Sequence, residues 1–482
     1  MAESQTYELV VGLEVHAQLL TQSKLFSGDS IAYGAEPNTQ VSAITLAHPG
    51  TLPKMNRRAI EYAIKLGLAC GCEIVKQNYF ARKNYFYPDL PKGYQISQHT
   101  TPICKGGSVK VRLENGEKHV RLNRIHIEED AGKSIHDVDV ENTCIDYNRA
   151  GTALLEIVTE PDIRSSEEAY QYLTELRKLV RYLGICDGNM EEGSFRCDAN
   201  ISVRKKGDSK LGTRVEVKNL NSIRHVKKAI EFEAARLQDL LESGEKIVQQ
   251  TRSFDAGKGT TFAIRDKEDA DDYRYFPDPD LPPFQLEQSF IDSIRQTIPV
   301  LQEERVRKYV NEWKLPEYDA WVLTEDRELS DYFEQAAEAG TNYKAVSNWV
   351  IGPVKSWLNE NNKSINEFPL TAGQLADLIK LVDDGKVSYT AASGRLFQHL
   401  LSHPQENAGD AAEKLNLVQQ SNASALEPII NDVLVKYADK VTEYKKGKKG
   451  LLSLFVGEVM KRSKGKADPR ATNEILLEKL KS

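Results

Sequence analysis

The sequence contains no run of eighteen apolar residues, the length that a bilayer-spanning helix needs. No basic segment followed by an apolar stretch precedes the alternating pattern that begins at Tyr7, so a secretory signal is missing too. Six cysteines in 482 residues are too few for a disulfide framework. These absences favour a cytoplasmic protein without a membrane segment. Cys70 and Cys72 leave two interpretations open: free buried thiols, or half of a zinc site whose other ligands folding brings near.

Familiar nucleotide-binding and hydrolase motifs are also missing. Residues 132–134 (GKS) end like a P-loop, but Ile127 stands where its first glycine belongs. No GxGxxG follows a predicted strand, and neither GxSxG nor HExxH occurs. A serine-rich amidase signature and a cysteine glutaminase motif are absent as well. We therefore expect any ATP to bind without a P-loop, and any ammonia to come from another protein.

The length of the chain predicts several domains, because 482 residues exceed what one hydrophobic core usually holds. Up to about residue 290, short alternating segments are separated by Gly, Pro and Asn, which is typical of mixed strands and helices. Residues 278–284 (DPDLPPF) then interrupt the pattern, and amphipathic helices are predicted beyond them. We predict domains at residues 1–293, 294–405 and 406–482.

The charge of the chain is unevenly distributed. The net charge is −7, yet residues 441–482 hold eleven basic and five acidic residues, so this tail carries +6 and the preceding 440 residues carry −13. A basic tail can contact a phosphate backbone, and it can equally be a solvated charged surface. Eight residues form the candidate phosphate-binding set: Lys445, Lys446, Lys448, Lys449, Lys461, Arg462, Lys464 and Lys466.

The first predicted strand, residues 7–16, places apolar side chains at odd positions. Because strand side chains alternate, Glu14 and His16 project from the opposite face, two residues apart. A carboxylate and an imidazole in this arrangement can share a divalent ion. The alternative is a solvent-facing polar edge.

The same pattern recurs in three other segments. Residues 195–204 place Arg196 and Asp198 on a polar face, and residues 214–218 place Glu216 and Lys218 there. Residues 124–130 (RIHIEED) end in consecutive acids, and alternation does not decide whether Glu128 or Glu129 faces the polar side. Such strands predict an antiparallel sheet covered on one face, whose open face binds Mg²⁺ and phosphate oxygens. An ordinary exposed face with weak ion pairs is the alternative.

Several long motifs together resemble the GatB family, the B subunits of aspartyl/glutamyl-tRNA amidotransferases. The match covers nearly the whole first domain, in order, and residues 451–480 resemble the YqeY-like tail of that family. The motifs are residues 11–16 (VGLEVH), 82–89 (RKNYFYPD), 90–98 (LPKGYQISQ), 126–134 (HIEEDAGKS), 148–151 (NRAG), 156–163 (EIVTEPDI), 190–200 (MEEGSFRCDAN), 217–222 (VKNLNS) and 271–277 (DDYRYFP).

The resemblance implies an α+β fold class. An antiparallel-sheet cradle similar to glutamine synthetase and guanido kinases precedes an all-α helical domain and an all-α YqeY-like tail that contacts tRNA. It also implies a heterotrimer with an amidase A subunit and a small C subunit. The implied activity is that of a ligase. ATP with Mg²⁺ phosphorylates the side-chain carboxylate of misacylated Glu-tRNA(Gln), Asp-tRNA(Asn) or both, and ammonia from the partner then amidates it.

The family pattern also implies roles for individual residues. Those expected around Mg²⁺ are Glu14, His16, Glu128 or Glu129, Asp198 and Glu216. Those expected on the nucleotide and phosphate side are Lys83, Asp271, Tyr273, Arg274 and Tyr275, with Arg196, Glu216 and Lys218 from the strands. Lys92 and Glu129 match positions along the ammonia channel of the family. Two other functions remain as alternatives: a carboxylate–ammonia ligase acting alone on a small molecule, and a non-catalytic tRNA-binding scaffold.

Overall fold

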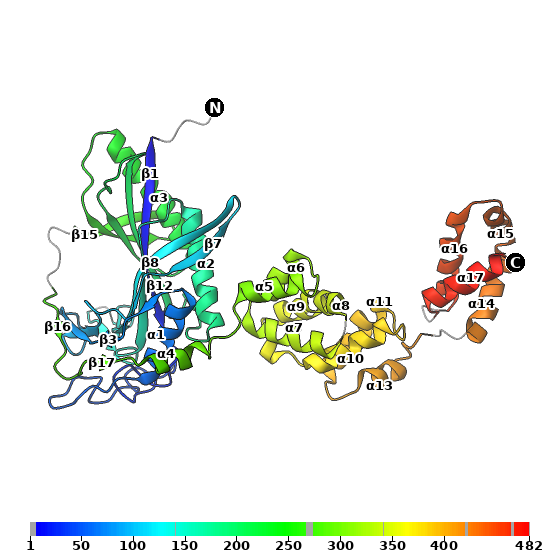
Figure 1. Ribbon diagram of the computed structural model, residues 1–482, viewed down its shortest axis with the longest axis horizontal. Coiled ribbons are helices and arrows are strands. Elements are labelled where there is room, and N and C mark those ends of the chain that lie inside the picture. The colour runs from blue at the N-terminus through cyan, green and yellow to red at the C-terminus, as the bar shows by residue number, and fades with distance from the viewer. Residues whose placement is uncertain are drawn as a thin grey trace. The chain divides into compact units, whose positions relative to one another are not determined.

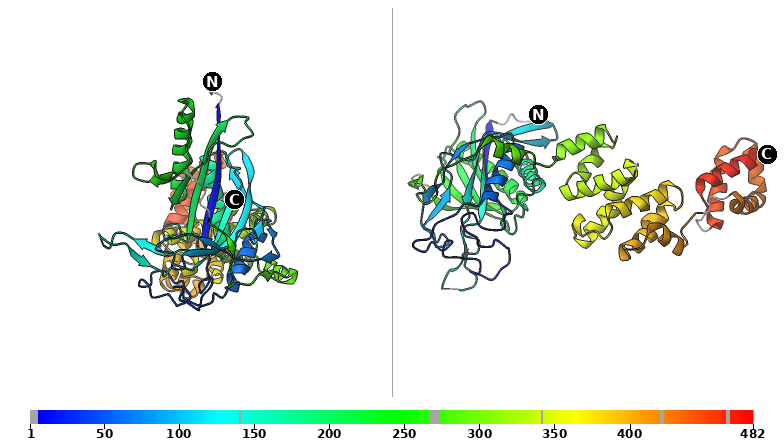
Figure 2. Two further views of the ribbon diagram at one scale, coloured as in Figure 1. Left: turned by 90° about the vertical axis from the view of Figure 1, so that its left-hand side faces the viewer. Right: turned by 60° about the horizontal axis from the view of Figure 1, so that its bottom comes forward.

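The computed structural model describes residues 6–139, 141–266, 273–340, 342–419, 423–463 and 467–481. The chain divides into two compact units, residues 1–301 and 302–482 (Figures 1 and 2). The domain boundaries at residues 293 and 405 remain predictions. Within the described ranges, no helix is both long and apolar enough to cross a membrane.

The first unit is built on a large sheet. Its strands are β1 (Tyr7–Gln18), β2 (Glu73–Ile74), β6 (Cys104–Lys105), β7 (Ser108–Leu113), β8 (Gly116–Glu129), β11 (Ala153–Thr159), β12 (Phe195–Lys205), β13 (Val215–Leu220), β14 (Gln250–Asp255) and β15 (Thr260–Asp266). In the described residues the order is β15-β14-β13-β12-β1-β11-β8-β6-β2, and β7 pairs with β8.

The sheet is mixed, which corrects the expectation of a purely antiparallel sheet. β13 and β14 are parallel, whereas the other paired strands of this sheet in the described residues are antiparallel. The physical reason is the connection: helix α3 (Ile223–Glu242) joins these two strands, and a long helical crossover returns the chain in the same direction.

Helices cover one face of this sheet. α1 (Arg57–Ala69) packs against β8 and β11, α2 (Ser166–Tyr182) against β7, and α3 against β12 and β13. Beneath them Leu13 and Val15 of β1 are fully buried, each stabilising the fold by about 1.5–3 kcal/mol. Glu14 and His16 lie half-buried on the opposite face. The alternation predicted for the first strand is therefore confirmed.

Smaller elements surround the large sheet. β4 (Ala81–Asn84) pairs with β5 (Tyr94–Ser97) and with β16 (Phe276–Pro277), and β5 also packs against β8. The remaining elements of this unit are β3 (Gln77–Asn78), β9 (Lys133–Ile135), β10 (Cys144–Asp146), β17 (Phe284–Gln285) and α4 (Gln288–Arg295). β4 brings Lys83 toward the polar end of β8, which positions one predicted site residue.

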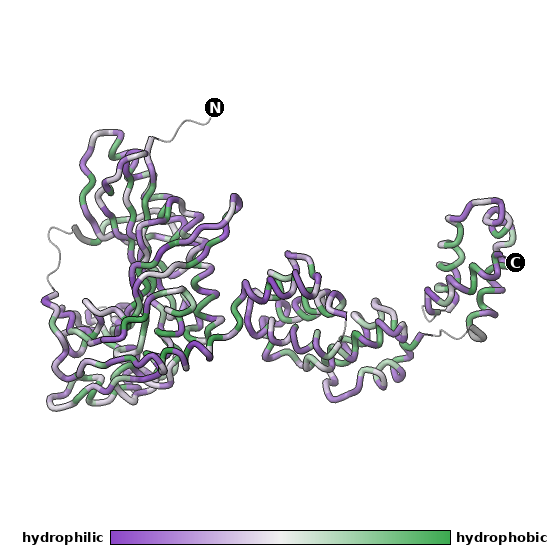
Figure 3. Tube along the Cα trace, in the orientation of Figure 1, coloured by the Kyte–Doolittle hydropathy of each residue, from purple (hydrophilic) through white to green (hydrophobic). Residues whose placement is uncertain are grey.

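The second unit is helical in its described residues. Its helices are α5 (Gln302–Asn311), α6 (Glu317–Leu323), α7 (Arg327–Ala339), α8 (Tyr343–Trp349), α9 (Lys355–Asn361), α10 (Ala372–Asp383), α11 (Tyr389–Ala391), α12 (Phe397–Ser402), α13 (Ala408–Lys414), α14 (Ala423–Lys436), α15 (Ala438–Lys445), α16 (Leu452–Arg462) and α17 (Pro469–Lys481). Residues 306–412 supply one hydrophobic core and residues 426–480 supply another. Figure 3 shows hydrophobic and hydrophilic residues alternating along these helices, as amphipathic packing requires.

The basic tail residues lie on the surface. Six of the eight predicted phosphate-binding residues are exposed, among them Lys445, Lys461 and Arg462. Lys448 pairs with Glu443 at 3.0 Å, and Arg462 approaches Asp432 at 3.5 Å. Lys464 and Lys466 lie outside the described residues.

Cys70 and Cys72 are free and buried. Burial raises the pKa of the Cys72 thiol to about 11 and that of Cys70 still further, so both thiols are protonated near neutral pH.

Candidate active site

Strand register brings sequence-distant polar residues together on the face of the sheet that α1–α3 leave uncovered. β1 lies between β11 and β12, so His16 is opposite both Glu156 and Arg196. Glu14 is opposite Asp198 on β12. On the far side of β11, His126 of β8 is opposite Glu156. The centre of the polar face is thus a continuous row across four strands.

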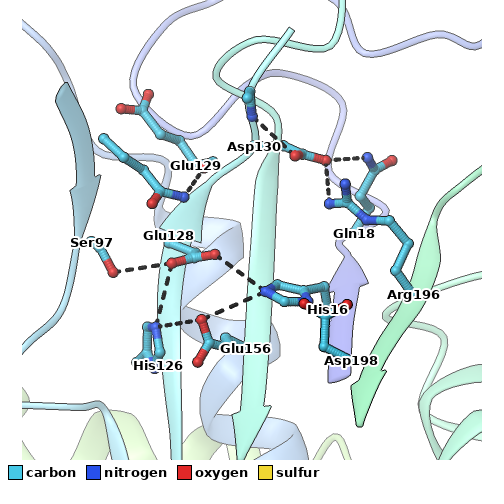
Figure 4. A network of polar contacts seen from close by, with 12 residues as sticks. His16, Gln18, Ser97, His126, Glu128, Glu129, Asp130, Glu156, Arg196 and Asp198 are labelled. Atoms are coloured by element: carbon cyan, nitrogen blue, oxygen red, sulfur yellow. Dashed lines mark hydrogen bonds and ion pairs between the residues drawn. The ribbon is translucent and has the colours of Figure 1, made fainter. Parts of the chain in front are cut away.

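Three of these side chains, His16, His126 and Glu156, form a compact cluster with Glu128 of β8, which Figure 4 shows. His16 Nε2 lies 3.8 Å from Glu128 Oε1 and 3.6 Å from Glu156 Oε2. His126 Nε2 lies 3.4 Å from an oxygen of each glutamate. One ligand atom each of His16, Glu128 and Glu156 fall within 4.8 Å of one another. Three convergent donors at this spacing can hold a metal ion.

The electrostatics of the cluster favour charged forms despite burial. Burial lowers the pKa of His126, but Glu156 and Glu128 outweigh it and raise this pKa to about 9. The pKa of His16 is raised for the same reason. Burial favours neutral Glu156, yet the two imidazoles keep its pKa well below the usual range.

Further acids extend the cluster toward β13. Lys218 Nζ lies 2.9 Å from Asp198 Oδ2 and 3.2 Å from Glu216 Oε1. Burial, followed by repulsion from Glu156, Asp198 and Glu216, raises the pKa of Glu14. Negative charge therefore accumulates on this side of the site, although Lys218 offsets part of it.

The structure separates Glu128 from Glu129, which alternation in the sequence left undecided. Glu128 faces the histidines, and Ser97 Oγ donates to its carboxylate at 3.2 Å. Glu129 points to the other side of β8, where it pairs with Lys92 and accepts a hydrogen bond from the Ile96 amide at 2.8 Å. Lys92 and Glu129 therefore lie together, and Glu129 is not brought to the cluster.

Arg196 is held at the end of the site near Gln18. Its guanidinium donates to Asp130 Oδ2 at 2.7 Å, and Gln18 donates to the same oxygen at 2.7 Å (Figure 4). The charge of Asp130, opposed by burial, raises the pKa of Arg196. Arg196 is thus a fixed cation beside the cluster.

Lys83 reaches the site from β4. Burial lowers its pKa, but the charge of Glu128 and weaker effects of Tyr275 and Glu156 outweigh burial and raise it. Its Nζ lies 4.7 Å from the centre of the Tyr273 ring, a cation–π contact. Tyr275 stacks on His99 with ring centres 4.0 Å apart. Three of the residues expected on the nucleotide side therefore gather near Glu128.

Arg274 lies between these two tyrosines and has φ = 45°, a left-handed conformation that is unfavourable for arginine. Such strain is typical of residues that a site holds in a required position. Asp271, the other residue expected here, lies outside the described residues.

Comparison with known proteins assigns the family. Residues 9–292 match a family described as the GatB/GatE catalytic domain, and residues 331–480 match one described as the GatB domain. The B subunit of the aspartyl/glutamyl-tRNA(Asn/Gln) amidotransferase of Geotalea daltonii is 51% identical, with 98% of this chain and 99% of the relative covered. Proteins of the same name from Geobacter sp. and Thioalkalivibrio sulfidiphilus are 50% identical with the same coverage. The chain belongs to the GatB family.

In this GatB chain, the assignment of roles from the sequence missed two central side chains, Glu156 and His126. Both stand inside motifs that carried the resemblance, but neither was assigned a role. A signal was available for Glu156: residues 153–159 (ALLEIVT) alternate, so Glu156 faces away from buried Leu155 and Ile157. His126 lies two residues before Glu128 and shares its face.

The donor set of the GatB cluster fits a divalent cation. Carboxylate oxygens suit Mg²⁺ and Mn²⁺, and a site with mixed oxygen and nitrogen donors can also bind divalent first-row metals such as Mn²⁺. After burial, repulsion from Glu156, Asp198 and Glu216 raises the pKa of Glu14, although Lys218 offsets part of this repulsion. A dication would offset that repulsion.

The raised pKa of His126 predicts how the free energy of unfolding depends on pH. Its folded pKa of about 9 exceeds the unfolded value of 6.5, so its stabilising effect is complete below pH 6.5 and is lost as pH rises through about 9. Without divalent ions, His126→Gln is expected to destabilise the protein by on the order of 2–3 kcal/mol at pH 6, and by much less at pH 10. Calorimetric unfolding from pH 6 to pH 10 measures this difference.

The matched control is His119→Gln, because His119 is an exposed histidine on the same strand, β8. Its effect on unfolding is expected to be small at every pH. A destabilisation by His126→Gln that stays constant or grows with pH would contradict the charged state assigned to His126.

Proposed function

We propose that this chain activates the side-chain carboxylate of a misacylated tRNA with ATP, as the B subunit of a tRNA-dependent amidotransferase and hence of a ligase complex. The substrates are Glu-tRNA(Gln), Asp-tRNA(Asn) or both. The observation that carries the proposal is the convergence of His16, Glu128 and Glu156 from three strands in a chain of this family. A phosphoryl-transfer site needs such a group beside fixed cations.

The reaction proceeds in two displacements. A carboxylate oxygen attacks the γ-phosphorus of ATP, the bond to the bridging β–γ oxygen breaks, and ADP leaves. Ammonia then attacks the carbonyl carbon of the acyl phosphate, inorganic phosphate leaves with the C–O electron pair, and the nitrogen loses a proton. The first step is needed because an unactivated carboxylate has no adequate leaving group.

The residues divide between metal and phosphate. His16, Glu128 and Glu156 would hold Mg²⁺, with Glu14, Asp198 and Glu216 beside them, and the ion when bound would neutralise phosphate charge. Lys83 reaches the cluster from β4 and Arg196 from β12, and Lys218 stands next to Asp198. These three cations can neutralise phosphate oxygens while the acids orient the metal. Tyr273, Arg274 and Tyr275, with Asp271, complete the nucleotide side of the proposal.

The fold and the second unit support the proposal in different ways. A sheet with helices on one face and polar side chains on the other is compatible with a cradle similar to glutamine synthetase and guanido kinases. The exposed lysines near α15 and α16 can contact tRNA phosphates, which the +6 charge of residues 441–482 favours. An amidase A subunit and a small C subunit would complete the heterotrimer.

We place the ammonia route on the opposite side of β8 from the cluster. There buried Glu129 pairs with partly buried Lys92, and the two residues line a small cavity of about 20 Å³ with Lys24 and Thr45. This volume admits about one small molecule such as water or ammonia. Glu128 and Glu129 are adjacent in sequence and point to opposite sides of β8. Ammonia in this cavity would therefore be separated from the activated carboxylate by this strand alone.

The proposal predicts the requirements of the assembled amidotransferase. Amidated tRNA should form from misacylated tRNA only with ATP, with either glutamine or ammonium as nitrogen donor. Lys92→Met should lower the glutamine-dependent rate at least about tenfold, whereas exposed Lys76→Met should leave it unchanged. The reaction is measured by releasing the amino acid from the tRNA and separating the side-chain amide from the acid by chromatography.

Two outcomes would contradict the proposal. Amidation of free glutamate or aspartate without tRNA would instead indicate a small-molecule carboxylate–ammonia ligase. Binding of tRNA without any ATP hydrolysis, in a complex whose glutaminase is active, would indicate a tRNA-binding scaffold.

A further inference from the structure

A long segment without a helix or strand of its own joins β1 to α1. All of residues 19–56 are described, and apart from one bridge between Ser23 and Ser30 they form neither kind of element. Figure 2 draws this segment in dark blue. Irregular segments of this length inside a compact domain usually serve a function. The contacts that hold it in one conformation therefore bear on the neighbouring site.

The carboxylate of Asp29 connects three points of this segment. One oxygen, Oδ2, accepts hydrogen bonds from Ser27 Oγ at 3.1 Å, from the amide and the hydroxyl of Ser42 at 2.9 Å each, and from Thr45 Oγ1. Burial raises the pKa of Asp29, but the hydrogen bonds from Thr45 and Ser42 outweigh burial and lower it overall. Asp29 is thus an anion on which four donors converge.

The bonds from Ser42 anchor a short turn. Leu46 N donates to Ser42 O at 3.0 Å, and Ala47 N donates to Ile44 O at 3.1 Å. Ala47 then ends the turn in a left-handed conformation, with φ = 55°. Because Asp29 binds both the amide and the hydroxyl of the first residue, the position of the whole turn depends on this carboxylate.

Two of the hydroxyl groups bonded to Asp29 belong to the wall of the small cavity in which we place the ammonia route. Ser27 and Thr45 both line this ammonia cavity, and Lys92 and Glu129 line it from other segments of the chain. The bonds to Asp29 hold the two hydroxyl-bearing residues in fixed positions. Without these bonds the wall can open to water, and ammonia is then lost by diffusion and by protonation.

The middle of the segment is held by other bonds. Asn38 Nδ2 donates to Ile145 O at 2.9 Å. Gln40 N donates to Asn148 Oδ1, also at 2.9 Å. Gln40 lines a larger cavity of about 560 Å³, to which Arg196 contributes beside the cluster. Since these bonds do not involve Asp29, a change at Asp29 should act on the ammonia cavity and leave the larger cavity in place.

We propose that Asp29 is a positioning residue for nitrogen transfer, which holds Ser27 and Thr45 in the wall of the ammonia cavity so that ammonia is retained on its way to the activated carboxylate. The inference rests on the proposed function and adds a residue on which the ammonia route depends. In the part of the chain that the structure describes, the hydrogen bonds of the Asp29 side chain stay within residues 27–45. Its substitution should therefore leave the chemical step unchanged.

Asp29→Asn is the first test, because the amide has the size of the carboxylate but lacks its charge and replaces one acceptor with a donor. The assembled amidotransferase is supplied with labelled glutamine, and the glutamate released is compared with the amidated tRNA formed. We expect a ratio of about one in the wild type and a rise of at least about threefold in Asp29→Asn, because ammonia escapes. With saturating ammonium, which reaches the cluster from solution, amidation should stay within about twofold of wild type.

Substitutions of Thr45 test the same contact from its other end and do not depend on the folding of Asp29→Asn. Valine keeps the shape of the side chain but cannot donate to Asp29, so Thr45→Val should raise the ratio as well. Serine keeps the hydroxyl, so Thr45→Ser should stay near the wild-type ratio. The control is Thr39→Val, because Thr39 is exposed on the same segment and its hydroxyl donates to the Glu36 carbonyl at 2.6 Å. It should leave the ratio unchanged.

The outcomes are distinct. A wild-type ratio in both Asp29→Asn and Thr45→Val would overturn the positioning role and leave the proposed function standing. An ammonium-dependent rate that falls as far as the glutamine-dependent rate would overturn it too, since Asp29 would then support the site as a whole. A wild-type complex that fails to amidate misacylated tRNA with ATP and ammonium would overturn the proposed function itself.

Discussion

Glu128→Gln is expected to lower the rate of tRNA amidation by at least about a thousandfold, because it removes an anionic oxygen donor from the centre of the cluster. The substitution keeps the size of the side chain and an acceptor for Ser97. Its effect should therefore fall on the chemical step. With ammonium as donor, the measurement is single-turnover amidation of misacylated tRNA, which bypasses the glutaminase partner.

Glu117→Gln is the matched control for this experiment. Glu117 belongs to the same strand, β8, but stands exposed at its hairpin end, where it pairs with Lys110 at 2.8 Å. Its substitution should leave amidation within about twofold of wild type, since surface ion pairs contribute little. A Glu128→Gln rate within tenfold of wild type would contradict the role assigned to the cluster.

The chemistry of the site depends on its place in the sheet. β1 is an interior strand with partners on both sides, so both of its neighbours can supply acids to one point. Glu156 comes from one neighbour and Asp198 from the other. The helices under the opposite face keep these strands packed, which holds the charged side chains in place although they repel one another. Rigid packing of this kind is what a preorganised charged site requires.

Alternation along single strands was the part of the site that the sequence could predict. The polar faces of β1 and β12 follow directly from the period of two, and Glu14, His16, Arg196 and Asp198 all lie where this period puts them. The same rule could not choose between Glu128 and Glu129, because β8 is buried on both faces near its end. Only the neighbours, Ser97 on one side and Lys92 on the other, separate the two acids.

Pairing between strands was not predictable from the sequence. Register joins residues more than a hundred positions apart, such as His16 and Glu156, and it depends on tertiary packing and not on local pattern. For the same reason the parallel pair β13 and β14 was missed, since its cause is the helical connection α3. The family resemblance supplied the function and the residues expected on the nucleotide side, and pairing then added His126 and Glu156 to the candidate site.

Binding of one divalent ion by groups from three separate strands can be tested with Mn²⁺, because this ion binds oxygen and nitrogen ligands and scatters anomalously. The measurement is an anomalous difference map of crystals grown with Mn²⁺, for the wild type and for Glu156→Gln. We expect a strong peak among His16, Glu128 and Glu156 in the wild type, and its loss in Glu156→Gln. A wild-type peak that none of these three side chains contacts, or one that persists unchanged in Glu156→Gln, would rule out a metal site shared by these strands.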